Sequence, residues 1–148
     1  PFAGELLSDC RPLHQLSAAA LEAGGVRTLR DPTRGGVATT LNEFVEGSAL
    51  TIELEEDAIP VDPAVAAACD LLGLDPLYSA CEGRMLAVVS PGQADAVLDA
   101  LHQTSGGEHA AMIGRVTESR PGHVVLRTAL GGSRILGKLT GAQLPRIC

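Results

Sequence analysis

The fold depends on one stretch of sequence, Arg30-Asp31-Pro32-Thr33-Arg34-Gly35-Gly36, in which a predicted strand ends and a predicted helix begins. Two consecutive glycines let the backbone turn sharply and let a ligand approach it closely. A helix that starts on such a turn presents free backbone N–H groups and the positive end of its dipole, and the two arginines add positive charge. The stretch therefore predicts a place where phosphate or another anion binds.

A purely structural interpretation of the same residues stays open. Pro32 and the glycines would shape a tight turn, Thr33 would cap the helix, and Asp31 would pair with an arginine. Short glycine-containing motifs often arise by chance, so the spacing alone favours this interpretation over anion binding.

On both sides of this stretch, the hydrophobic periodicity predicts alternating helices and strands. The predicted helices are residues 12–23, 37–46, 62–73 and 91–103. The predicted strands are residues 26–30, 51–55, 85–90, 111–117, 123–128 and 133–136. This order is typical of an α+β or layered α/β domain.

Two of the strands carry more detailed expectations. In residues 51–55, Ile52 and Leu54 are expected to point inward and Glu53 outward. The outward glutamates belong to an acidic cluster that is expected to be a solvated strand edge, formed by Glu53, Glu55, Glu56 and Asp57. Residues 85–90 are apolar and are expected to form a central strand that is covered on both faces.

The composition excludes several classes of protein. The chain has 148 residues, enough for one domain, and its 11 basic and 18 acidic residues give a net charge of −7. Because it is acidic and has only one Tyr and two Phe, it lacks the positive field and the stacking surface that nucleic acid requires. Its apolar runs, such as Met85–Val89, are too short to span a membrane. The four His and four Cys lack zinc-ligand spacing, which predicts no metal site and reduced thiols, as in the cytoplasm.

The chain is predicted to divide into a domain of residues 1–137 and a mobile tail of residues 138–148. The last residue of the tail, Cys148, could bring its thiol into a pocket and out again, as a carrier does. The adjacent α-carboxylate disfavours the thiolate, so this thiol would need an activating partner. A thiol without any role stays open as the alternative. Since the chain starts at Pro1 and shows no signal sequence, it is expected to be part of a longer protein.

Residues 78–84 form a loop before the strand at 85–90, and this loop contains Glu82. A carboxylate at the edge of a buried strand is expected to be partly desolvated, which would make Glu82 a usable general base. The alternative is an exposed glutamate, or one paired with Arg84. Its neighbour Cys81 is expected to be a small buried apolar side chain.

Four segments together closely resemble the HypE family of hydrogenase maturation factors: Arg30–Ala38, Leu72–Tyr78, Glu82-Gly83 and the terminus Pro145-Arg146-Ile147-Cys148. The resemblance extends over essentially the whole chain and corresponds to the C-terminal half of such proteins. The Asp-Pro-Thr-Arg-Gly-Gly element is shared, more loosely, with the superfamily of aminoimidazole ribonucleotide synthetase and selenophosphate synthetase. The resemblance implies an α+β fold, a layered α/β/α domain like the C-terminal domain of aminoimidazole ribonucleotide synthetase and partly ferredoxin-like.

The resemblance also implies an activity, that of an ATP-dependent carbamoyl-cysteine dehydratase. A HypF-type carbamoyltransferase would load Cys148, dehydration would turn the S-carbamoyl group into thiocyanate, and a HypC–HypD complex would receive the cyanide ligand of [NiFe]-hydrogenase. ATP and Mg²⁺ would bind mostly to an N-terminal domain outside this chain, which would also form the homodimer interface. We therefore expect no tightly bound cofactor in this chain, and no ATP hydrolysis by it alone.

The same resemblance assigns roles to individual residues. Cys148 would carry the reacting group and Glu82 would be the base that removes the nitrogen protons. The residues that would hold the transferring phosphate or orient the tail are Asp31, Thr33, Arg34, Gly35 and Gly36. Pro145, Arg146 and Ile147 would complete the functional tail.

At one position, the sequence departs from the family pattern. Cys81 stands where the family usually has the Asn of an Asn-Glu-Gly loop, and a thiol is a weak hydrogen-bond donor. A disulfide between Cys81 and Cys148 is expected in oxidised protein. Two other functions stay open: a docking module that passes a thiol-borne group between partners without catalysis, and a related phosphoryl-transfer enzyme acting on a small molecule.

Overall fold

The structure is a computed structural model and describes residues 8–140. These residues form four α-helices, α1 His14–Ala23, α2 Gly36–Val45, α3 Pro63–Leu72 and α4 Ala94–His102. They also form six strands, β1 Val26–Arg30, β2 Thr51–Glu55, β3 Leu86–Val89, β4 Gly114–Thr117, β5 His123–Arg127 and β6 Ser133–Ile135. Three single-turn 3₁₀ helices lie between them, η1 Glu56–Ala58, η2 Pro76–Tyr78 and η3 Pro91–Gln93. The predicted α+β class is confirmed.

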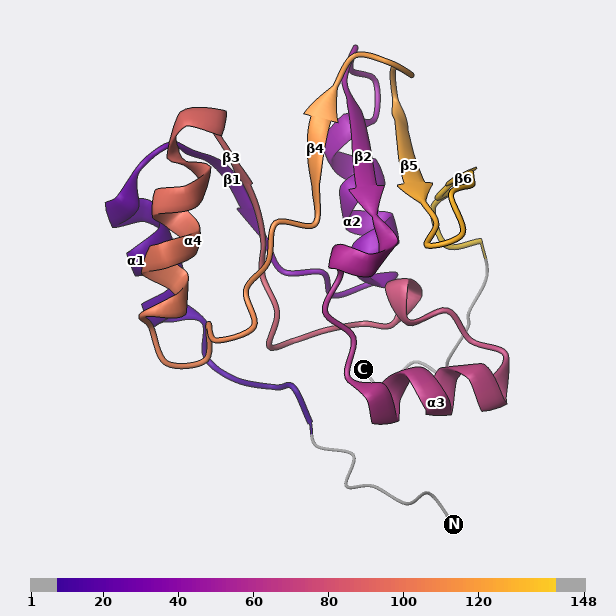
Figure 1. Ribbon diagram of the computed structural model, residues 1–148, viewed down its shortest axis with the longest axis horizontal. Helices are drawn as coiled ribbons and strands as arrows, with labels where there is room; N and C mark the ends of the chain where they lie inside the picture. Colours follow the sequence, from indigo (N-terminus) through magenta and orange to yellow (C-terminus); the bar gives the residue numbers. More distant parts are fainter. Residues whose placement is uncertain (1–7, 141–148) are drawn as a thin grey trace.

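The described residues pack as two parts that lie side by side (Figure 1). In one part, β1 and β3 pair antiparallel, and α1 packs against α4 beside them. The other part contains a sheet of strand order β4-β2-β5-β6, in which β2 and β5 are parallel and the other pairs are antiparallel. Residues 31–35 and 79–85 both run between the two parts, so the segments predicted to carry the function lie where the parts join.

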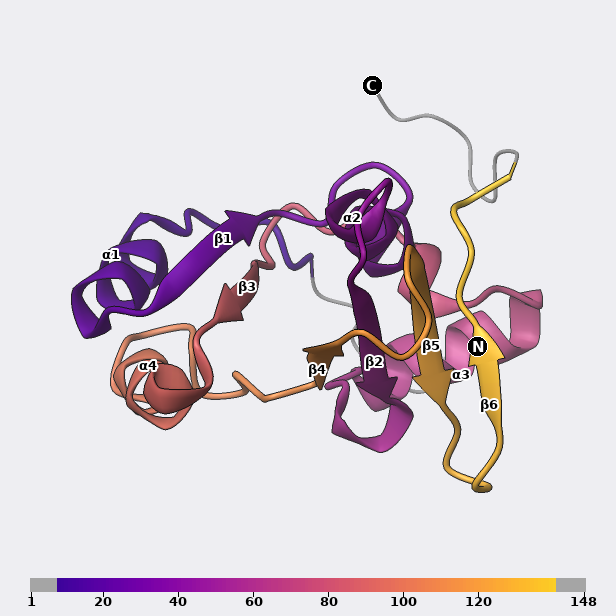
Figure 2. The same cartoon turned by 90° about the horizontal axis from the view of Figure 1, so that it is seen from above.

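Helix α2 lies along the four-stranded sheet and forms the main core with it (Figure 2). Its buried residues Ala38, Leu41 and Val45 recur at helical spacing and face the sheet. The sheet contributes Ile52, Leu54, Val124 and Leu126, and Leu136 follows β6 into the same core. Each of these larger side chains stabilises the fold by about 1.5–3 kcal/mol when it is fully buried.

The bounds of α3 follow directly from local sequence chemistry. The Asp62 carboxylate accepts a hydrogen bond from the N–H of Ala64 at 2.8 Å, and Pro63 occupies the first helical position. Gly73 ends the helix in the left-handed conformation, at φ 65°. The helix predicted over residues 62–73 is therefore confirmed, apart from its two capping residues.

Two predictions about strands were wrong. Strand β3, predicted to be central, pairs with β1 in a two-stranded sheet. Glu53, predicted to be solvated, is only 9% exposed, because β2 lies between β4 and β5 and is not an edge strand. Hydrophobic alternation shows which side of a strand faces the core, but it does not show which strands flank it. Among the described residues, no helix is long and apolar enough to cross a membrane.

Candidate functional site

The turn that begins α2 can be built only from glycine. Gly35 and Gly36 both have positive φ, 76° and 62°. A Cβ atom at Gly36 would lie 2.6 Å from the carbonyl oxygens of Leu77 and Ser79, so the start of α2 packs directly on the backbone at and after η2. At this turn the N–H of Gly36 donates to the carbonyl oxygen of Thr33 at 3.4 Å. The next N–H groups of the first turn have no partner inside the helix.

The loop after η2 lies beside the stretch before α2. The Asp75 carboxylate accepts a hydrogen bond from the N–H of Leu77 at 2.9 Å and so caps η2. The N–H of Cys81 then donates to the carbonyl oxygen of Pro32 at 3.0 Å. Two segments that are about 50 residues apart in the sequence are thereby brought together, as expected if both belong to one site.

The predicted phosphate-binding residues lie on the turn in different environments. Asp31 and Arg34 are exposed, and Thr33 is half-buried. The structural interpretation predicted that Thr33 caps α2, and this was wrong. The N-cap residue is Gly35, and no side chain makes a capping hydrogen bond at the start of this helix. The neighbouring Arg30 binds Glu43, with 3.1 Å between Nη1 and Oε2. The exposed guanidinium of Arg34 at the positive end of α2 suits an anion from solvent.

Glu82, the predicted base, is exposed in this structure. The partial burial expected for it is therefore not found in the described residues. Arg84 pairs with Asp9 instead, at 3.7 Å between Nε and Oδ2. Gly83 lies directly against the backbone of Asp9, which fits Gly at this position because a side chain would clash with that carbonyl group.

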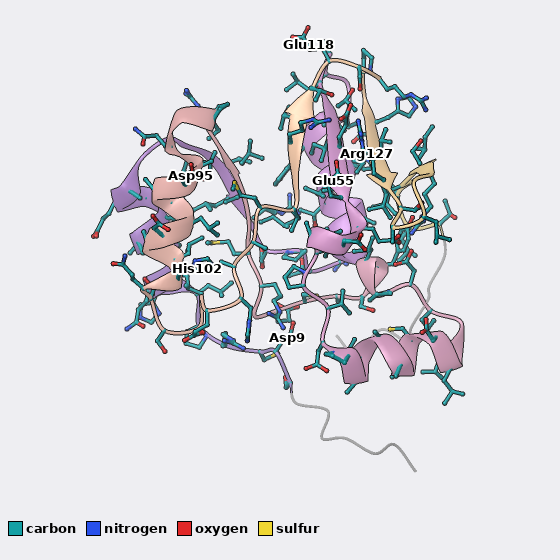
Figure 3. All side chains as sticks on the ribbon, viewed as in Figure 1. Asp9, Glu55, Asp95, His102, Glu118 and Arg127 are labelled. Carbon is teal, nitrogen blue, oxygen red and sulfur yellow. The ribbon has the colours of Figure 1, made fainter. Side chains whose placement is uncertain are left out.

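The thiol of Cys81 is half-buried, and its Sγ lies 3.4 Å from the carbonyl oxygen of Ser79. Burial raises the pKa of this thiol, the negative charge of Asp9 raises it further, and Arg84 opposes the shift. Cys81 is thus mainly protonated at neutral pH, and a protonated thiol is a poor nucleophile. Figure 3 labels Asp9 on the N-terminal segment that approaches this loop.

Leu139 lies near the same turn. Its N–H donates to Oγ1 of Thr39 at 3.1 Å, and Thr39 belongs to the first turn of α2. The hydroxyl of Thr39 in turn occupies the space that a side chain on Gly35 would need. The predicted tail residues Pro145, Arg146, Ile147 and Cys148 lie outside the described residues.

One cluster of charged side chains, around Glu53, was not predicted from the sequence. Glu53 Oε2 lies 2.8 Å from Arg115 Nη2 and 3.3 Å from Arg127 Nη2, and Oε1 accepts a hydrogen bond from Ser119 Oγ at 2.8 Å. The hydrogen bond from Ser119 and the bond from Arg115 lower the pKa of Glu53 to about 2. Arg127 also approaches Glu55, at 3.6 Å, and Figure 3 shows these two side chains together on the sheet.

Glu53, Glu55, Ser119 and Arg127 of this cluster line an open hollow of about 490 Å³ on the sheet, together with residues of the turn before β6. Its carboxylates are already neutralised by arginines, which suits a structural role. In the sequence, the cluster was indicated only by Glu53 within the predicted strand 51–55, and the neighbouring strands that carry the arginines could not be predicted. Among residues 8–140, no three His, Cys, Asp or Glu side chains are arranged to hold a metal ion.

Comparison with known proteins defines the class. Residues 3–127 match the family described as AIR synthase related protein, C-terminal domain, and the chain belongs to this family. It is 50% identical over 149 aligned residues to a protein of Bradyrhizobium diazoefficiens named carbamoyl dehydratase HypE, covering 99% of this chain and 43% of that protein. It is 46% identical to the carbamoyl dehydratase HypE of Escherichia coli K12, covering 98% of this chain and 43% of the relative.

Solved structures agree with these relatives. A crystal structure of hydrogenase maturation protein HypE superimposes with a TM-score of 0.92 and 44% identity, covering 100% of this chain and 48% of the other. A structure of HypE in complex with ATP gives a TM-score of 0.90 at 44% identity, covering 100% of this chain and 46% of the other. A structure of a HypE–HypF complex gives a TM-score of 0.87 at 35% identity, covering 94% of this chain and 45% of the other. The chain thus spans less than half the length of the relatives it matches.

Proposed function

We propose that this chain is the C-terminal part of an ATP-dependent carbamoyl-cysteine dehydratase that converts S-carbamoyl Cys148 into thiocyanate. The product would supply the cyanide ligands of [NiFe]-hydrogenase. Family membership and the names of relatives at 46–51% identity support this activity.

One observation carries the proposal beyond the names: the chain approaches the start of α2 just before its last nine residues. Leu139 bonds to Thr39 in the first turn of α2, and the Cys81–Glu82 loop lies beside the same turn through Pro32. Nine extended residues reach at most about 30 Å. This length supports our proposal that the thiol of Cys148 reaches the glycine turn and Glu82.

The chemistry divides among few groups. ATP would phosphorylate the carbamoyl oxygen, which then leaves as phosphate. The two protons on the nitrogen must also leave, and Glu82 is the carboxylate we assign to accept a proton. Its exposure in this chain fits a base that becomes enclosed only when the tail and the rest of the protein are in place. Arg34, Thr33 and the positive N-terminal end of α2 at Gly35 and Gly36 fit a phosphate group, with Asp31 orienting the tail.

The remaining parts of the proposal concern the whole protein. Mg²⁺ and most of the ATP contacts are assigned to an N-terminal domain, which also forms a homodimer, and this chain alone is expected to be inactive. A HypF-type carbamoyltransferase is proposed as the partner that loads Cys148, since a relative is known in a HypE–HypF complex. We also propose that a HypC–HypD complex accepts the cyano group, and that the reactions occur in the cytoplasm.

The experiment follows the mass of the full-length protein that carries S-carbamoyl Cys148, before and after addition of ATP and Mg²⁺. Loss of one water from the Cys148 peptide is expected. Glu82→Gln should slow this loss by about 10²–10⁴-fold in a single turnover, because a positioned base contributes that much. Glu118→Gln, a change of another exposed glutamate at the end of the sheet away from the start of α2, serves as the matched control (Figure 3).

Formation of hydrogenase cyanide by the full-length protein and its partners provides a second measurement, and other outcomes would contradict parts of the proposal. If Cys148→Ser still supports formation of hydrogenase cyanide, the proposed function is wrong. If the carbamoyl group passes unchanged to a partner, the chain is a docking and carrier module. If full activity remains in Glu82→Gln, another group is the base.

A further inference from the structure

Residues 136–139, which we call the strap, hold the chain against α2 where the predicted C-terminal tail begins. The strap begins in the core, because Leu136 is fully buried and its N–H donates to the carbonyl oxygen of Val124 at 2.8 Å. Its other end is the bond from Leu139 to Thr39 in the first turn of α2. The strap thus runs toward the N-terminal end of the helix, where the candidate site lies.

A single stripe of α2 holds the strap. Thr39 and Asn42 are three residues apart in α2, which places them on one face of the helix, and Glu46 is the residue that ends it. Nδ2 of Asn42 donates to the carbonyl oxygen of Leu136 at 2.7 Å, and Nζ of Lys138 lies 2.7 Å from Glu46 Oε2. The ion pair is solvent-exposed and contributes little, so the hydrogen bonds carry most of the attachment.

Tyr78 joins the strap to the candidate site. Its hydroxyl donates to the carbonyl oxygen of Gly137 at 3.0 Å. Its backbone carbon packs against Gly36, where an added Cβ would lie 2.8 Å from it. Tyr78 also ends η2, three residues before the Cys81 N–H that bonds to Pro32. One residue therefore contacts both the glycine turn and the segment from which the tail departs.

We propose that Tyr78 and Asn42 are positioning residues that make the tail depart from the start of α2. This inference rests on the proposed function, in which Cys148 carries the reacting group. With the strap closed, nine residues of sequence follow the last anchored residue, Leu139. With it open, the last anchored residue is the buried Leu136, so the length beyond the anchor is greater and starts farther along the helix. The closed strap raises the effective concentration of the thiol at the site, because reach and direction are fixed in advance.

The first measurement concerns the strap alone. Trypsin is added to the full-length protein, and cleavage after Lys138 is followed by mass spectrometry, with cleavage after Arg115 in β4 as a report on global unfolding. Such cleavage tracks the population of the open form. Tyr78→Phe removes one hydrogen bond of ordinary net strength, so cleavage after Lys138 should rise about five-fold and cleavage after Arg115 should not change.

Thr104→Val is the matched control, because it removes one part-buried hydroxyl that donates to the carbonyl oxygen of Ala100 at 2.8 Å, in α4. Cleavage after Lys138 should stay unchanged in this variant. Unchanged cleavage in Tyr78→Phe would overturn the proposed strap.

The second measurement concerns the reaction. In the double variant Tyr78→Phe with Asn42→Ala, single-turnover dehydration of S-carbamoyl Cys148 should slow by about five-fold or more, with the KM for ATP unchanged. Faster cleavage after Lys138 with an unchanged dehydration rate would overturn the positioning role. A Cys148→Ser protein that still yields cyanide would refute the proposed function itself, and that result is separate from the trypsin result.

Discussion

Replacing Gly36 with alanine tests how tightly the start of α2 is joined to the loop that precedes Glu82. Gly36 has φ of 62°, and a Cβ there would lie 2.6 Å from two backbone oxygens, those of Leu77 and Ser79. The backbone of η2 is held by the cap from Asp75, so it cannot withdraw without loss of that hydrogen bond. The contact must therefore be relieved by moving α2 or the loop.

The expected loss of stability has two parts. A left-handed backbone costs an L-residue about 1–2 kcal/mol. Forcing an extra methyl group into packed structure typically costs about 1–3 kcal/mol more. Gly36→Ala should therefore destabilise the chain by about 2–5 kcal/mol in total.

Gly73→Ala separates these two parts. Gly73 has nearly the same φ, 65°, but no heavy atom lies within 4 Å of an added Cβ. This control should lose only the backbone part, about 1–2 kcal/mol. The difference between the two variants measures the contact between α2 and the η2 loop.

Urea unfolding followed by far-UV circular dichroism provides the measurement, with the chain and both variants compared at equal slopes. At a slope of about 2 kcal/mol per molar urea, an extra loss of about 2 kcal/mol lowers the midpoint by about 1 M. A Gly36→Ala protein no less stable than Gly73→Ala would refute the reasoning, because the two glycines have nearly the same φ and differ in what would surround the added methyl group.

Two further predictions follow from the perturbed pKa values. Because the pKa of Glu53 is lowered to about 2 from 4.5, its contribution to stability is complete above about pH 4.5 and is lost as the pH falls toward 2. The Tm of the unchanged protein should therefore fall more steeply between pH 5 and 2 than that of Glu53→Gln, and parallel curves would contradict this. Because burial raises the pKa of the Cys81 thiol, iodoacetamide at pH 8 should alkylate exposed Cys10 well before Cys81, and equal rates would contradict this. Peptide mapping of oxidised protein should find a Cys81–Cys148 disulfide, and two free thiols would remove that expectation.

Much of the local structure could be predicted from the sequence. All four helices and all six strands lie within or next to the predicted ranges, and β2 has the predicted bounds Thr51–Glu55. Helix ends marked by specific chemistry, such as Asp62 and Gly73 around α3, were predicted most closely. Where the signal was weaker, the bounds shifted, as in α4, which begins at Ala94 after a separate 3₁₀ turn at 91–93.

The candidate site was predicted in part. The sequence indicated the glycine turn and the loop with Glu82, and the structure brings these two segments together through the bond from Cys81 to Pro32. The burial expected for Glu82 was wrong, because exposure depends on which segments cover a loop. The strap and its bonds to Tyr78 and Asn42 could not be predicted, since residues 136–139 show no periodicity.

The sequence by itself determined where chain direction changes and which faces are apolar, because glycine, proline and capping residues act within a few bonds and hydrophobic period is a local property. Only the tertiary structure decided which strands are neighbours, and therefore that Glu53 is buried between two arginines and that β3 is not central. Only the tertiary structure decided that Leu139 is held at the first turn of α2. Such features depend on contacts between residues far apart in the chain, and no local pattern encodes them.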